Sequence, residues 1–160
     1  VPIGPDDTFG ALEAKLCSVG GDLLIDVIKD FDKGAITETP QDETLVTYAP
    51  KIELEDCEIN WSQDSVQIHN LVRGVNPYPS AWCHVLVKGA TKRLKVLKTE
   101  VVDTMSGEPG TILDSDRHGV TVACGSGAVR LKELQLEGKK AMSASDLFRG
   151  VELSFLRTND

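Results

Sequence analysis

Residues 81–102 read AWCHVLVKGATKRLKVLKTEVV. Apolar and polar side chains alternate on both sides of the dipeptide Lys88-Gly89, which predicts two strands, 81–87 and 93–102, joined by a turn. Further short runs rich in Val, Leu and Ile follow between turn residues, at 111–114, 119–124 and 128–136. Five short strands with a spacing of about ten residues predict a small β-barrel that is closed or nearly closed.

The chain before this region begins with the pattern of an amphipathic helix. Thr8 is a typical N-cap for a helix over 8–32, and Gly34 is a typical stop. Apolar residues recur at helical steps: Leu12, Leu16, Val19, Leu23, Val27 and Phe31. Gly20-Gly21 in the middle predicts either a bend or a break into two helices. Because a single helix cannot bury its own apolar stripe, we expect this one to need a surface to dock on.

Two shorter helices are predicted, one on each side of the strands. In the first, over 62–74, Ser62 is the expected N-cap and Gly74 the expected end. The second, over 143–149, has Ser143 as its expected N-cap. The fold class is therefore predicted as mainly β with flanking helices.

The segment between the first helix and the barrel has the composition of an extended linker. Residues 34–60 lose the helical period, contain two prolines and are rich in acids. The net charge of the chain is −8, but residues 1–60 carry 4 Lys, no Arg and 14 acids, a net charge of −10. Residues 61–160 carry 13 Lys and Arg against 11 acids, a net charge of +2. This asymmetry raises the question whether the two parts have different partners.

Several kinds of protein and site are disfavoured by the sequence. No apolar run approaches the ~18 residues of a membrane span, and the N-terminal residues have no secretory-signal pattern. The four cysteines are widely spaced, which is typical of reduced thiols in a cytosolic protein and not of a zinc site. The three histidines lack metal-ligand or catalytic-triad spacing. We therefore expect no metal, no membrane association and a cytoplasmic location.

A series of motifs, in order along the chain, is similar to those of methionyl-tRNA formyltransferases. The linker resembles the interdomain linker of that family at 41–43 (QDE), 47–52 (TYAPKI) and 59–61 (INW). The stretch RGVNPYP at 73–79 looks like the motif that opens the family's C-terminal domain. PGTI at 109–112 and QLEGKKAM at 135–142 are similar to its barrel turn and its terminal Gly-Lys-Lys motif. The resemblance extends over essentially the whole chain.

This resemblance implies the C-terminal part of such an enzyme. Residues 1–33 correspond to the last helical piece of a Rossmann-like formyltransferase domain, 34–60 to the interdomain linker, and 61–160 to a small OB-like, tRNA-binding barrel domain. In that family the co-substrate 10-formyltetrahydrofolate and the catalytic residues belong to the Rossmann-like domain. We therefore expect no catalytic residue and no cofactor in this chain. The implied partner is initiator methionyl-tRNA, held so that its amino group reaches the formyl donor.

Cationic residues are the candidates for tRNA contacts, because phosphate binding needs several positive charges on one surface. The candidates are Lys139 and Lys140, which match the family's motif, and Arg73, Lys51, Lys95 and Lys132. Alternatives stay open, because Arg73 equally suits the negative end of its helix and Lys51 suits pairing with neighbouring acids. The other strand lysines also suit a solvated face. The small positive charge of residues 61–160 predicts weak autonomous binding.

The aromatic residues and the overall function each have two interpretations. Trp61, Tyr78 and Trp82 are of the type that stacks on bases, but we interpret all three as packing anchors. The alternative to a tRNA-binding role is an accessory domain of a related sugar-nucleotide or folate formyltransferase or hydrolase with no RNA partner.

Overall fold

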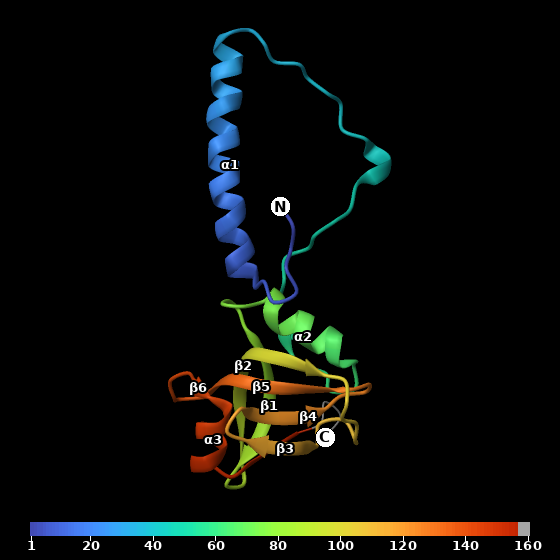
Figure 1. The fold of residues 1–160 in the computed structure, drawn as a ribbon, viewed down its shortest axis with the longest axis vertical. Coiled ribbons are helices and arrows are strands. Elements are labelled where there is room, and N and C mark those ends of the chain that lie inside the picture. The colour runs from blue at the N-terminus through green and yellow to red at the C-terminus, as the bar shows by residue number, and fades with distance from the viewer. Residues whose placement is uncertain (157–160) are drawn as a thin grey trace. The chain divides into compact units, whose positions relative to one another are not determined.

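A computed structural model describes residues 1–156 of the chain. These residues form two compact units, which divide between Ile52 and Glu53. The first unit contains one long helix and an extended segment, and the second contains all the strands (Figure 1).

The first unit is dominated by α1 (Phe9–Asp32). The Thr8 side chain caps it by accepting a hydrogen bond from the Ala11 N–H, as predicted, and Gly34 follows its end with a φ of 67°. The 24-residue helix is continuous through Gly20-Gly21, so the predicted break into two helices does not occur. It has no buried residue, and its apolar stripe is exposed within this unit. The following segment is extended except for a 3-10 turn, η1 (Glu43–Leu45).

The second unit is built on one curled antiparallel sheet (Figure 1). Its strands are β1 (Ala81–Val87), β2 (Ala90–Val102), β3 (Ile112–Asp116), β4 (Gly119–Ala123), β5 (Ala128–Leu136), β6 (Met142–Ser143) and β7 (Leu153–Phe155). They follow the order β3-β4-β5-β2-β1-β7, and β6 pairs with β5 off this path. The predicted mainly β, OB-like fold class is confirmed. In the described part of the chain the sheet is an open half-barrel, with β3 and β7 as its edges.

Strand β2 begins three residues earlier than the sequence predicted. Ala90 pairs with Val87 across a tight two-residue turn, in which Lys88 and Gly89 have φ values of 50° and 81°. Both residues are in the left-handed region, which is the geometry of the hairpin turn that matches strand twist. Strand β2 therefore pairs with β1 from its first residue and with β5 from Leu94 onward.

Two helices and a short 3-10 turn, η2 (Glu55–Cys57), accompany the sheet. Helix α2 (Ser65–Gly74) is capped by Asp64 and not by Ser62, because the Asp64 side chain and Gln67 satisfy each other's backbone N–H groups in a capping box. Helix α3 (Ala144–Gly150) is capped by Ser143, as predicted. Helix α2 packs mainly on β2, and α3 packs on β5 and β4.

The core of the second unit is formed by the inner face of the sheet, α2, α3 and residues 57–61. Within residues 53–60, which the sequence assigned to the linker, Cys57 and Ile59 are buried. The Ile59 N–H donates to the Trp82 carbonyl at 2.7 Å, and the Trp82 indole N–H donates to the Leu54 carbonyl at 2.9 Å. These contacts fasten the end of the extended segment to β1.

A close backbone approach at Gly125 generates a stability prediction. The Gly125 N–H donates to the carbonyls of Trp61 and Gln63, and a Cβ at this position would lie 1.9 Å from the Ser62 carbonyl oxygen. Because the obstacle is backbone, we expect Gly125→Ala to lower the free energy of unfolding by about 1–3 kcal/mol.

Urea unfolding followed by tryptophan fluorescence measures this effect, since both tryptophans lie in the second unit. The matched control is Gly74→Ala, because a Cβ there meets no atom within 4 Å and alanine favours helix. Equal stabilities of Gly125→Ala and the wild type would contradict the prediction.

Candidate nucleic-acid interface

The outer face of β1, β2 and β5 carries a cationic groove. Leu94 and Val96 of β2 are buried, so the alternating Arg93 and Lys95 point to the opposite face. The register places His84 beside Arg93, and Lys95 between Trp82 and Gln135. A groove of about 520 Å³ lies over this face, lined by His84, Thr91, Lys92, Arg93, Lys95, Gln135, Leu136, Glu137 and Gly138.

The charged groups of the groove are held in defined positions. The Arg93 guanidinium lies 4.5 Å from the centre of the Trp82 ring, within cation–π range. Glu137 accepts from the Arg93 N–H at 3.2 Å and donates its own N–H to the Arg93 carbonyl at 3.0 Å. His84 Nδ1 lies 3.7 Å from a carboxylate oxygen of Glu58. The lining includes three cationic residues, Lys92, Arg93 and Lys95, against one carboxylate, so the groove is suited to anionic groups such as phosphates.

One predicted candidate, Lys95, lies in the groove, and two more follow its lining residues in sequence. Lys95 lines the groove and donates to the Pro79 carbonyl at 3.3 Å. Lys139 and Lys140 are exposed in the turn between β5 and β6, immediately after the groove residues Glu137 and Gly138. This turn is fixed because the Lys139 N–H donates to the Leu136 carbonyl at 2.8 Å and the Lys139 carbonyl accepts from the Gln135 amide at 3.0 Å. The two lysines therefore lie on a fixed turn that directly follows the residues lining the groove.

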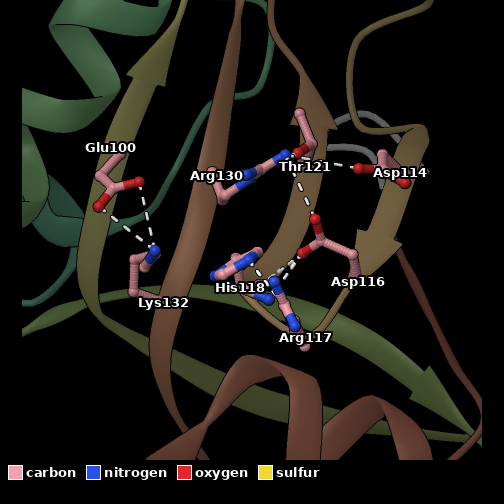
Figure 2. Close-up of polar contacts among 9 residues, drawn as sticks. Glu100, Asp114, Asp116, Arg117, His118, Thr121, Arg130 and Lys132 are labelled. Atoms are coloured by element: carbon pink, nitrogen blue, oxygen red, sulfur yellow. Dashed lines mark hydrogen bonds and ion pairs between the residues drawn. The ribbon is translucent and has the colours of Figure 1, made fainter.

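The other candidates lie elsewhere. Lys132 of β5 pairs with Glu100 of β2 at 3.3 Å (Figure 2). Arg73 lies in the last turn of α2 and donates to the Asn70 side chain at 2.8 Å. Lys51 belongs to the first unit and is exposed there. Arg73 thus lies where a cation suits the negative end of the helix, the alternative that the sequence left open, whereas Lys132 forms an ion pair that the sequence did not predict.

Arg93 was missing from the predicted set, although the sequence contained a signal for it. Arg93 and Lys95 alternate with the apolar Leu94 and Val96, so a period of two places both cations on one face. The sequence did not predict that Glu137 and Gln135 line the groove, because their position there depends on the register between β2 and β5.

The aromatic residues divide into two groups. Trp61 and Trp82 are buried, as expected of packing anchors, and Trp61 contacts Phe155 edge-to-face with ring centres 5.1 Å apart. Tyr78 is 79% exposed, so its interpretation as a packing anchor is wrong within the described structure. It lies in a turn between Pro77 and Pro79, and its exposure places it at the surface.

Neither a metal cluster nor a membrane span is found in residues 1–156. This part of the chain has no group of three or more metal-ligating side chains and no helix long and apolar enough to cross a bilayer. Burial raises the pKa of the Cys124 thiol to about 11, and it raises the pKa of the buried Cys83 thiol strongly as well. These cysteines are therefore neutral thiols at physiological pH, unsuited to nucleophilic chemistry.

A second polar cluster lies on β3, β4 and β5 (Figure 2). Arg130 lies 3.4 Å from Asp114 and 3.9 Å from Asp116, and it donates to the Thr121 hydroxyl at 3.2 Å. The backbone N–H of His118 donates to Asp116 at 2.7 Å. This hydrogen bond, together with the charge of Arg130, lowers the pKa of Asp116 from its usual 3.8.

The lowered pKa predicts how stability depends on pH. A carboxylate whose pKa is lower in the folded chain stabilises the fold above the unfolded pKa and loses this effect as the pH falls through the folded pKa. Asp116→Asn keeps an acceptor oxygen but removes the charge. We expect this variant to be less stable than the wild type at neutral pH and the difference to disappear in strong acid.

Urea unfolding of both proteins over an acidic pH series measures this difference. Asp103→Asn is the control, since Asp103 is an exposed carboxylate outside the cluster of Figure 2. A difference between Asp116→Asn and the wild type that grows toward low pH would rule out the assigned role.

Comparison with known proteins identifies the family. Residues 51–152 match the family described as formyl transferase, C-terminal domain. The chain therefore belongs to that family. It is 48% identical over 157 residues to the methionyl-tRNA formyltransferase of Protochlamydia amoebophila, covering 98% of this chain and 49% of the relative. It is 43% identical over 154 residues to that of Brucella anthropi, covering 96% and 49%.

These comparisons confirm the resemblance to the C-terminal part of methionyl-tRNA formyltransferases, and the chain spans about half the length of the curated relatives it matches. A similar fold occurs in HypX from Aquifex aeolicus. One HypX variant has a TM-score of 0.65 at 20% identity, over 92% of this chain and 27% of that protein. HypX in complex with tetrahydrofolic acid has a TM-score of 0.61 at 22% identity, over 79% and 22%. At such identity the likeness shows the fold alone.

Proposed function

We propose that this chain is the tRNA-positioning part of a methionyl-tRNA formyltransferase. The observation that carries the proposal is the groove lined by Lys92, Arg93 and Lys95, which the exposed Lys139-Lys140 turn follows directly in sequence. The relatives named methionyl-tRNA formyltransferase support initiator methionyl-tRNA as the partner. Cationic side chains on a rigid sheet face suit the phosphate backbone of RNA, because they fix its position without reading its sequence.

This chain contributes to the reaction by positioning the tRNA. Formyl transfer moves the formyl group from 10-formyltetrahydrofolate to the amino group of methionine on the tRNA, with that amino group as nucleophile. Residues of the groove would hold the tRNA so that the amino group lies near the donor, which lowers the entropic part of the barrier. We assign the catalytic residues and the folate site to a Rossmann-like domain outside this chain, and the activity to the cytoplasm.

We expect the groove to bind RNA weakly and with an affinity that depends strongly on salt. Each phosphate contact that a cation makes contributes about −0.7 to −0.9 to the slope of log affinity against log salt concentration. Glu137 partly offsets the three cations of the groove, so the exposed lysines of the β5–β6 turn should contribute a large share.

Reversing the charge of these lysines tests the proposal. We expect Lys139→Glu combined with Lys140→Glu to weaken tRNA binding at low salt by about tenfold or more and to make the salt slope shallower. Fluorescence anisotropy titrations with labelled tRNA at several salt concentrations measure both quantities.

The matched control is Lys29→Glu combined with Lys33→Glu, which changes the net charge equally at exposed positions outside the groove. Both of these lysines make exposed ion pairs, which contribute little to stability. If the two double variants bind tRNA equally, a site on the Lys139-Lys140 turn is refuted. If the wild type binds a sugar nucleotide and no tRNA, the role without RNA is favoured.

A second test concerns chemistry. We expect this chain alone to form no formylmethionyl-tRNA from initiator methionyl-tRNA and 10-formyltetrahydrofolate, because no acid, base or nucleophile is assigned to it. A discontinuous assay of the formylated product, with the Protochlamydia amoebophila enzyme as positive control, measures this. Turnover above the rate without protein would overturn the assignment of catalysis to another domain.

A further inference from the structure

Tyr78 is an exposed aromatic residue on a turn that the structure holds rigid. Its side chain is 79% exposed, and single exposed apolar residues are common enough to need no explanation. The surroundings of this residue are what distinguish it.

Several contacts fix the turn that carries Tyr78. Pro77 and Pro79 on either side restrict the backbone. Ser80 is buried, with a left-handed φ of 76°; its N–H donates to the Val75 carbonyl at 2.9 Å and its hydroxyl to the Pro77 carbonyl at 2.7 Å. The Asn76 amide donates to the Leu97 carbonyl of β2. The backbone that carries the ring therefore needs no further ordering when a ligand binds against it.

The turn also adjoins the cationic groove. Lys95, which lines the groove, donates from Nζ to the Pro79 carbonyl at 3.3 Å, one residue from Tyr78. Lys95 pairs in the register with Trp82 of β1, and the Arg93 guanidinium lies over the ring of that tryptophan. An exposed aromatic face beside backbone-binding cations is the combination by which proteins hold single-stranded nucleic acid.

We propose that Tyr78 is a stacking platform for an unpaired base of the RNA whose phosphates lie in the groove. This inference rests on the proposed function and adds to it that the bound RNA has a single-stranded part at this turn. Stacking uses the face of the ring and leaves the phenol hydroxyl free, so phenylalanine replaces tyrosine and an aliphatic side chain does not.

The experiment uses the full 160-residue chain and two labelled RNAs. One is a hairpin with a single-stranded overhang in which one base is 2-aminopurine, and the other is the same hairpin with a blunt end. We expect Tyr78→Ala to lower affinity for the overhang RNA by about tenfold and for the blunt RNA by less than about twofold. Quenching of 2-aminopurine fluorescence, which reports stacking, should be lost as well.

Two further variants separate stacking from packing. Tyr78→Phe should bind and quench like the wild type, whereas Tyr78→Leu should behave like Tyr78→Ala although it retains apolar bulk. Thermal unfolding followed by tryptophan fluorescence should be unchanged in all three variants, because the side chain is exposed.

The outcomes distinguish this inference from the proposed function. If Tyr78→Ala binds both RNAs like the wild type while the Lys139 and Lys140 double variant binds them weakly, stacking is overturned and tRNA positioning stands. Equal losses on both RNAs with a lowered melting temperature mean that Tyr78 packs against protein, which also overturns stacking. If the wild type binds neither RNA, both proposals fail.

Discussion

Strand β2 hydrogen-bonds to β1 along one edge and to β5 along the other, and the remaining elements of the second unit depend on this double pairing. The register shifts between Val96 and Thr99, where β2 changes from a partner of both strands to a partner of β5 alone. Such irregularities increase bend and twist, so they help the sheet to curl around its core. On the concave side this encloses Leu94 and Val96; on the other side it places Arg93 and Lys95 next to Gln135.

The sequence predicted most of the elements, because their signals are local. The alternation in 81–102 and the leucine-rich run 128–136 indicated β1, β2 and β5, and the positions of α1 and α3 followed from Thr8 and Ser143 as N-caps. Strands β6 and β7 have two and three residues, too few for a period to appear, and they form only because β5 and β1 offer free edges. The N-cap of α2 was misplaced because Ser62 and Asp64 are both good caps, and the side chain of Gln67 decides between them.

The candidate site was predictable only in part, for a related physical reason. Lys139 and Lys140 were found from a motif, and Lys95 from its place on a strand. The groove that contains Lys95 and ends next to Lys139 depends on strand register, which a single sequence does not encode locally. Lys132 is a strand lysine like Lys95, yet its ammonium group pairs with Glu100 of the neighbouring strand, and this pairing became visible only in three dimensions. Likewise, the exposure of Tyr78 reflects how Ser80 and Asn76 anchor its turn.

The position of strand β3 at an edge of the open sheet has a further consequence. An exposed edge strand offers unpaired backbone groups to other chains, and charged side chains on the edge are a common protection against such association. Asp114 and Asp116 lie on this edge, where Arg130 and the turn at His118 hold them in place. The two carboxylates therefore guard against intermolecular strand pairing as well as contributing to the fold.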